Sequence, residues 1–110
     1  MEKSKIQTYL GFCVRSRKIV YGTDEIETQK KGVFLIVFDE TLSENSLKVL
    51  YRVSEKQGCQ MVKAEKDALA NALFKPSVKA VVIKDKNLAK AIGDCVEEDS
   101  QFKFHFGGSK

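Results

Sequence analysis

The sequence is poor in the residues that build metal sites and disulfide frameworks. It has one histidine, His105, and three widely separated cysteines, Cys13, Cys59 and Cys95. An odd number of separated cysteines fits neither a disulfide framework nor a Cys-x-x-Cys metal site. With no second histidine and no cysteine close by, His105 is not a credible metal ligand or catalytic residue. We therefore expect buried free thiols and no bound metal.

Long apolar runs are also missing. The longest, residues 33–38, is far too short to cross a bilayer, and the chain shows no basic-then-apolar leader at its start. We therefore expect a cytoplasmic protein with no membrane partner. At 110 residues, of which 43% are hydrophobic, the chain is long enough for one domain with its own core and too short for two.

Enzymatic patterns are equally scarce. The pair Gly107 and Gly108 stands near the end of the chain, not between a strand and a helix, so no glycine-rich phosphate loop is present. No set of Ser, His and Asp has supporting local context. We expect a non-enzymatic protein without a cofactor. The net charge of +4 modestly favours a polyanionic partner.

Apolar spacing and turn residues predict helices that alternate with strands. The continuous apolar run of residues 33–38 is typical of a central strand covered on both faces. Ser43 can cap a following helix, and Gly58 can end it. Such alternation predicts an α/β fold, a three-layer α/β/α sandwich. The predicted helices are residues 6–14, 24–31, 44–56, 67–73 and 87–96, and the predicted strands are residues 19–21, 33–38, 59–62 and 78–83.

The tail of residues 99–110 follows a different pattern, so we assign residues 1–98 to the domain. In the tail, Phe102, Phe104 and Phe106 alternate strictly with Lys103 and His105. This alternation fits either an edge strand packed on the domain or a loose arm that becomes ordered on a partner. We favour the packed strand because three exposed phenylalanines would promote aggregation.

The stretch most informative for function is residues 10–25. It leads from an apolar helix end into a basic turn with Arg15, Arg17 and Lys18, then into a short strand, and then to Gly22. Gly22 suits a sharp bend between the strand and a new helix because it can adopt backbone conformations closed to other residues. A helix start beside a cationic turn would attract phosphate groups or the acceptor-rich edge of a base.

The residues after Gly22 can also be explained by helix formation alone. Thr23 or Asp24 can cap the new helix, and Asp24 with Glu27 has the spacing of a capping box. From these residues alone, the simple start of a helix is the better supported interpretation.

Several motifs in order resemble one family. Residues 10–25 read Leu-Gly-Phe-Cys-Val-Arg-x-Arg-Lys-Ile-Val-x-Gly-x-Asp-Glu, similar to the opening of the kink-turn RNA-binding ribosomal protein family, in particular its small bacterial YlxQ-like branch. Asp39 with residues 43–45 resembles the family's Asp-x-Ser-x-Asn segment. Residues 72–76 and 80–83 resemble its Ala-Ile-Gly-Lys-Pro turn and last strand. The resemblance covers residues 6–92 and implies the same sandwich with a small mixed sheet.

The resemblance also implies a function, the binding of structured RNA by a monomer, with ribosomal RNA as one candidate. The turn from Gly22 to Glu25 would meet the tandem G·A pairs of a kink-turn. Glu25 would accept hydrogen bonds from a guanine, while basic residues neutralise phosphates without reading sequence. An apolar loop would cover an extruded base. The implied RNA-binding residues are Arg15, Arg17, Lys18, Gly22, Thr23, Asp24, Glu25, Thr28, Leu73, Phe74, Lys75 and Pro76.

The chain departs from the family pattern at three of these positions. Asp24 stands where the family commonly has Asn, and an ionised carboxylate accepts hydrogen bonds but cannot donate them. Thr28 stands where the family has Lys, although Lys30 and Lys31 follow in the next turn. Phe74 replaces a glycine, and the aromatic ring could either stack on a base or pack on the protein.

These departures keep two other functions open. The first is a protein-interaction module of the same fold that has lost kink-turn recognition and works through its Phe-rich tail. The second is a small-anion site at the helix start after Gly22. RNA binding predicts sensitivity to the loss of Glu25, whereas the protein-interaction function predicts sensitivity to changes in the tail.

Overall fold

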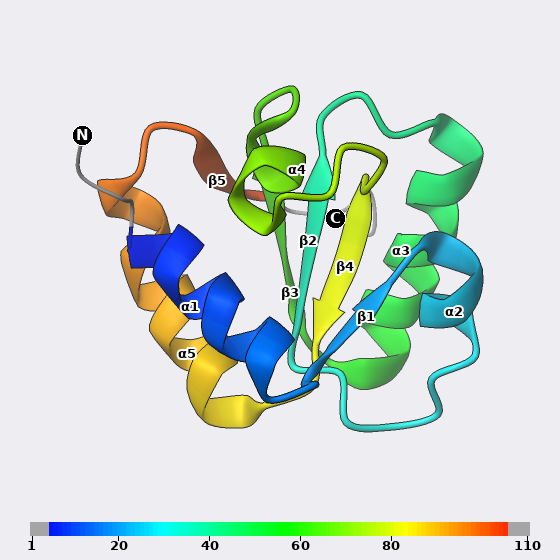
Figure 1. Cartoon of the computed structure of the whole chain (residues 1–110). Helices are drawn as coiled ribbons and strands as arrows, with labels where there is room; N and C mark the ends of the chain where they lie inside the picture. Colours follow the sequence, from blue (N-terminus) through cyan, green and yellow to red (C-terminus); the bar gives the residue numbers. More distant parts are fainter. Residues whose placement is uncertain (1–4, 106–110) are drawn as a thin grey trace.

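A five-stranded mixed sheet lies between helices on both faces in the computed structural model, which describes residues 5–105 (Figure 1). The strand order is β1-β4-β2-β3-β5, in which β2 and β3 are parallel and every other neighbouring pair is antiparallel. The α/β sandwich predicted from the sequence is confirmed. The strands are β1 Ile19–Tyr21, β2 Leu35–Asp39, β3 Gln60–Ala64, β4 Ala80–Ile83 and β5 Phe102–His105.

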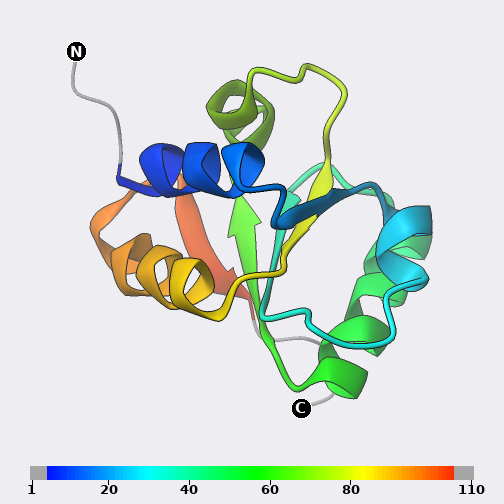
Figure 2. The same ribbon diagram turned by 60° about the horizontal axis from the view of Figure 1, so that its bottom comes forward.

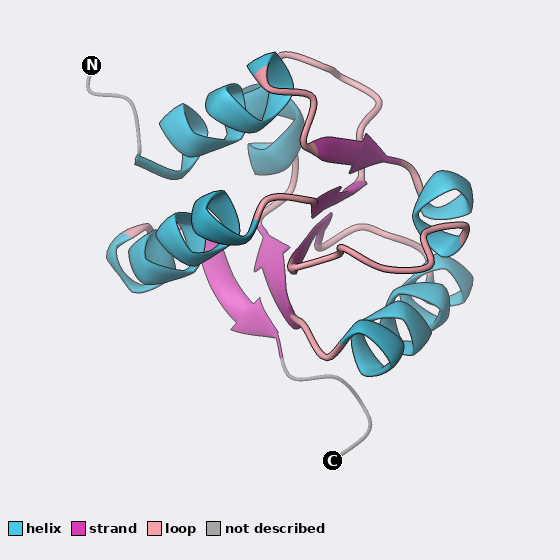
Figure 3. Cartoon of the chain, turned by 90° about the horizontal axis from the view of Figure 1, so that it is seen from below, coloured by secondary structure: helices cyan, strands magenta, loops and turns pink. Residues whose placement is uncertain are grey.

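Helices α1, α4 and α5 cover one face of the sheet, and α2 and α3 cover the other (Figure 3). Side chains of β2 alternate between the two cores: Leu35 and Val37 face the first, and Ile36 and Phe38 the second. The whole of β2 is buried, as predicted for a central strand, although it begins at Leu35 and not at residue 33. The helices are α1 Lys5–Arg15, α2 Thr23–Glu27, α3 Glu44–Gln57, α4 Ala68–Leu73 and α5 Lys86–Cys95, followed by the 3-10 turn η1 Val96–Glu98.

The ends of α3 follow the sequence prediction. The Ser43 hydroxyl accepts a hydrogen bond from the backbone N–H of Ser46 at 3.2 Å, and Gly58 ends the helix in a left-handed conformation with φ of 66°. Both features satisfy backbone groups that an unprotected helix end would leave unpaired. Other predicted boundaries in residues 59–96 lie within two residues of the observed ones.

Helix α2 is shorter than predicted and is capped differently. It begins at Thr23, after Gly22 in the capping position, so Asp24 and Glu27 lie inside the helix and the predicted capping box is wrong. The helix ends at Glu27, and residues 28–34 form an irregular connection. Lys84 holds this connection because its ammonium donates to the side-chain oxygen of Gln29 and the carbonyl of Lys31, both at 2.7 Å.

The C-terminal strand β5 forms one edge of the sheet, paired antiparallel with β3, so the predicted packed strand is confirmed (Figure 2). Phe102 is 3% exposed and Phe104 packs against the same core, whereas Phe106 lies outside the described residues. On the opposite face, His105 stacks on Tyr51, with 2.8 Å between its Nε2 and the Tyr51 hydroxyl. Burial, helped by the charge of Lys63, lowers the pKa of His105.

The three cysteines are free, but only Cys13 is fully buried, so the expectation of buried thiols holds in part. Burial raises the pKa of Cys13 and of Cys59 to about 11, which leaves both thiols protonated at neutral pH. No helix within residues 5–105 has both the length and the apolar character that a membrane span requires.

Candidate nucleic-acid interface

The start of α2 and the loop after α4 meet at the same end of the β1–β4 ladder. β1 runs antiparallel to β4 and pairs Tyr21 with Val81. One residue further, the backbone N–H of Gly22 donates to the carbonyl of Ala80 at 2.9 Å. Residues 74–79 lead directly into Ala80, so strand pairing brings this loop to the same end of the ladder as the turn at residues 22–25. We call residues 22–25 the α2 corner and residues 73–76 the α4 loop.

The α2 corner depends on the backbone freedom of glycine. Gly22 has φ of 84° and ψ of 142°, a conformation that side-chain-bearing residues rarely adopt. The carbonyl of Gly22 accepts a hydrogen bond from the N–H of Ile26 at 2.9 Å, and the Ile26 side chain is fully buried. Asp24 and Glu25 are exposed, with their carboxylates in solvent where they can accept hydrogen bonds. Thr23 is half-buried.

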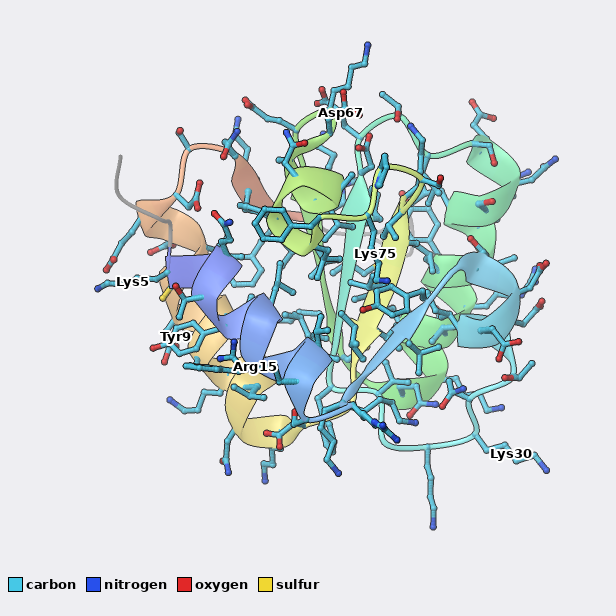
Figure 4. The ribbon with its side chains drawn as sticks, viewed as in Figure 1. Lys5, Tyr9, Arg15, Lys30, Asp67 and Lys75 are labelled. Carbon is cyan, nitrogen blue, oxygen red and sulfur yellow. The ribbon has the colours of Figure 1, made fainter. Side chains whose placement is uncertain are left out.

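Lys75 links the α4 loop to the strand that precedes the corner. Its ammonium nitrogen lies 5.2 Å from the centre of the Tyr21 ring, in cation–π geometry. Figure 4 shows Lys75 between the α4 loop and β1. Burial, with a smaller effect of Cys13, raises the pKa of the Tyr21 phenol. The contact orients Lys75 and leaves its charge exposed.

The basic turn lies at the other end of β1. Arg15 ends α1 with its guanidinium carbon 4.8 Å from the centre of the Phe12 ring, and Arg17 has a left-handed φ of 60°. The Lys18 carbonyl accepts a hydrogen bond from the N–H of Lys84 at 2.7 Å. The three-residue strand β1 therefore separates the basic turn from the α2 corner by about 10 Å, so the two are not side by side.

Among residues 5–105, the four basic residues that the resemblance implies form no ion pair. Within residues 5–105, the ion pairs join Lys5 to Glu98, Arg52 to Glu27 and Lys90 to Asp94. A cation without a carboxylate partner can approach a phosphate without first losing an attraction to its own chain. The implied phosphate-binding residues are all exposed: Arg15, Arg17, Lys18 and Lys75.

A cleft of about 340 Å³ separates α1 from the end of α4. Gly11, Val14 and Arg15 line it from α1. Leu73 and Phe74 line it from the other side. Leu73 is only 6% exposed and belongs to the core, so little of it could cover a base. Phe74 is 79% exposed, which rules out packing in the core.

Neither Thr28 nor Lys30 supplies a cation beside the α4 loop (Figure 4). The Thr28 hydroxyl donates to the carbonyl of Glu25 at 2.7 Å, so this side chain turns back onto its own helix. Lys30, which the sequence offered as a cation in place of a lysine at position 28, lies away from both Lys75 and Arg15 (Figure 4). Pro76 is exposed beside Lys75 in the α4 loop.

A buried carboxylate below this surface had no structural role assigned from the sequence. Asp39 is 1% exposed; its Oδ1 accepts hydrogen bonds from the N–H and hydroxyl of Thr41 at 2.7 and 2.6 Å, and its Oδ2 accepts one from the N–H of Asp67 at 2.8 Å. Burial raises its pKa, but these hydrogen bonds and the charge of Lys79 outweigh burial and lower the pKa overall. Asp39 thereby joins the end of β2 to the residue before α4. The sequence signal that could have revealed this role is the position of Asp39 directly after the apolar run of residues 33–38.

Within residues 5–105, no group of three or more His, Cys, Asp and Glu side chains could hold a metal ion.

No protein-family model matches the chain, and no curated protein matches it. Among solved structures, the chain is similar to a protein with unknown function from Bacillus halodurans C, with a TM-score of 0.73 and 15% sequence identity. The match covers 86% of this chain and 99% of the other. At this identity, the likeness shows a shared fold.

Proposed function

We propose that this protein is a small, cytoplasmic, non-enzymatic RNA-binding protein that recognises structured RNA of the kink-turn type, with ribosomal RNA as a candidate target. The observation that carries the proposal is that the α2 corner and the α4 loop lie at the same end of the β1–β4 ladder, where Lys75 lies over Tyr21, the residue before Gly22. These two segments lie far apart in the sequence, and both carry the motifs that resemble the kink-turn binders.

Recognition would begin at the α2 corner. The exposed carboxylate of Glu25 can accept hydrogen bonds from the N1 and N2 groups of a guanine in a sheared G·A pair. Because Gly22 has no side chain, the backbone beside it can approach the RNA closely. Asp24 adds a second acceptor next to Glu25, so the corner favours base edges rich in donors over phosphate oxygens.

Phosphate binding would come from Lys75 and from the basic turn at the other end of β1. Arg15, Arg17 and Lys18 lie at one end of β1, and Lys75 lies over the strand itself. If all four contact phosphates, the logarithm of the affinity falls with the logarithm of salt concentration with a slope of about −3 to −3.6. These contacts position the RNA without reading its sequence.

The test is a titration of the protein with a kink-turn RNA and with a matched duplex that lacks the G·A pairs, at two salt concentrations. We expect a clear preference for the kink-turn, weakened by salt. Glu25→Ala should reduce kink-turn affinity by about tenfold or more, because the loss of a bidentate base contact typically costs about 1–3 kcal/mol. The matched control is Glu55→Ala, which removes an exposed carboxylate from α3.

Equal, weak binding to both RNAs, unaffected by Glu25→Ala, would refute kink-turn recognition. That result would direct attention to a protein partner. The tail is then a poor first choice for mutation, since Phe102 is buried and Phe104 packs on the core.

A further inference from the structure

We propose that the cleft between α1 and the end of α4 binds one unpaired nucleobase of the RNA, stacked on Phe74 with its phosphate against Arg15. The proposal rests on the RNA-binding function above and adds a contact on the other side of the α4 loop from the α2 corner. Lys75 of the loop reaches toward β1, whereas Phe74 lines the cleft.

The backbone at Phe74 is in a conformation that a phenylalanine does not favour. Phe74 follows α4 with φ of 57° and ψ of 36°, and the N–H of Lys75 donates to the carbonyl of Ala70 at 3.0 Å. This is the helix ending in which glycine is the common residue, because a left-handed side-chain-bearing residue costs about 1–2 kcal/mol. With the ring 79% exposed, packing within the chain recovers little of that cost.

Gly11 is a second residue at this cleft that lowers the stability of the fold. It lies within α1, where glycine is less stable than alanine by about 0.5–1 kcal/mol. A Cβ atom at this position would meet no other atom within 4 Å, so packing does not require a glycine here. Its absence of a side chain keeps the α1 wall of the cleft open. Two residues that disfavour stability therefore face one cleft.

Exposed apolar side chains lie in and beside this cleft: Val14 and Phe74 line it, and Phe12 follows Gly11 in α1. Phe12 and Val14 of α1 and Phe74 beyond α4 are three of the four large hydrophobic residues exposed within residues 5–105. The fourth, Phe34, lines a separate pocket beside α5. Within the described chain, Arg15 is the one ionisable side chain that lines the cleft. Its guanidinium lies over Phe12 and has no carboxylate partner there.

An aromatic face beside a guanidinium matches a nucleotide better than an apolar peptide. A base is a flat ring joined to an anionic phosphate, and stacking on an exposed aromatic residue is the usual way in which proteins bind unpaired bases. A cleft of about 340 Å³ lies at the lower end of small-ligand sites. A docked helix would need several apolar anchors along a longer groove. The cations Arg17 and Lys18 follow Arg15 in the chain and add to the attraction for an RNA strand.

The proposal can be tested by amide NMR with the full chain and uridine monophosphate as the probe. We expect saturable shifts at the amides of Gly11, Ala72 and Phe74. Ribose phosphate, which lacks the base, should not reproduce them. Uridine, which lacks the phosphate, should bind more weakly than the monophosphate and should not respond to Arg15→Gln.

Two variants separate a binding role from a structural one. Phe74→Gly removes the ring at a position where glycine is the favoured residue, and Gly11→Leu fills the cleft in open space. Each should keep a well-dispersed spectrum and raise the dissociation constant for the nucleotide by about tenfold, as expected for the loss of one stacked base. Phe34→Ala is the matched control, since it removes another exposed phenylalanine at a distant pocket and should leave binding unchanged.

The proposal is overturned by the absence of saturable shifts at the cleft, by equal shifts with ribose phosphate, or by tighter binding of an acetylated phenylalanine amide, which would indicate a protein side chain as the occupant. Kink-turn titrations separate it from the proposed function. Kink-turn preference without cleft shifts refutes the cleft alone. Cleft shifts without kink-turn preference support a nucleotide site and refute kink-turn recognition at the α2 corner.

Discussion

Two loops at the same end of the sheet, one after β2 and one before β4, differ in what holds their conformation. The turn that follows β2, residues 39–43, is organised by the buried carboxylate of Asp39, which accepts three hydrogen bonds from Thr41 and Asp67. The α4 loop places an exposed phenylalanine in a left-handed conformation. The chain that leads from the α4 loop into β4 contacts the first turn, since the Lys79 ammonium donates to the Thr41 hydroxyl at 2.6 Å and the Lys79 carbonyl accepts from the N–H of Asp39 at 2.8 Å.

The difference indicates which loop supports the fold and which is available for binding. Every oxygen of the Asp39 carboxylate has a partner, so the first turn has the features expected of a stabilising element. The α4 loop has an unfavourable backbone conformation and an exposed ring, features that concentrate at functional sites. Asp39 also fixes the position of the α4 loop, because it binds the N–H of Asp67, the residue before α4.

The largest effect should come from breaking the supporting turn. Asp39→Ala removes a buried acceptor of three hydrogen bonds, each worth about 1 kcal/mol, so we expect a loss of about 3 kcal/mol in the free energy of unfolding. Urea unfolding followed by circular dichroism measures the change. Asp24→Ala, which removes an exposed acid from the α2 corner, is the matched control and should change stability by less than about 0.5 kcal/mol. A loss of less than about 1 kcal/mol in Asp39→Ala would contradict the supporting role.

A smaller effect of opposite sign is expected in the α4 loop. Phe74→Gly relieves a left-handed phenylalanine and loses little buried area, so the free energy of unfolding should rise by up to about 1 kcal/mol. Phe34→Gly is the control, because Phe34 is also exposed but does not have a positive φ, and it should lower stability. The comparison of the two loops fails if Phe74→Gly is less stable than the wild-type protein.

The sequence predicted the sheet better than the connections. The central strand β2 and the caps of α3 at Ser43 and Gly58 followed from local patterns, because a doubly covered strand and a capped helix are written in consecutive residues. The C-terminus of α2 did not follow from a local pattern. Residues 28–34 are held by Lys84, which lies far along the chain, so no local pattern could reveal that the helix ends at Glu27.

The candidate site shows the same limit. The resemblance implied RNA-binding roles for Glu25 and Lys75, and strand pairing brings their two segments to the same end of the sheet. The cleft between α1 and α4 was not predicted, because neither helix contains it alone. The sequence showed Gly11 as a glycine within the predicted helix 6–14. It showed Phe74 at a position where the resembled pattern has glycine. Recognising that both face one cleft required the packing of α1 against α4.

The smallest expected effect tests the supporting turn through pH. The pKa of Asp39 is lower in the folded protein than its ordinary value of 3.8, so near that value the unfolded chain binds more protons than the native one. The stabilisation is complete above the ordinary pKa and is lost as pH falls through the folded pKa. Urea unfolding at decreasing pH should therefore show less acid-induced loss of stability in Asp39→Asn than in the wild-type protein. Thr41→Val removes the hydroxyl donor, raises the pKa of Asp39 toward its ordinary value and should give an intermediate loss. Identical acid dependence in all three proteins would show that the carboxylate charge does not hold this turn.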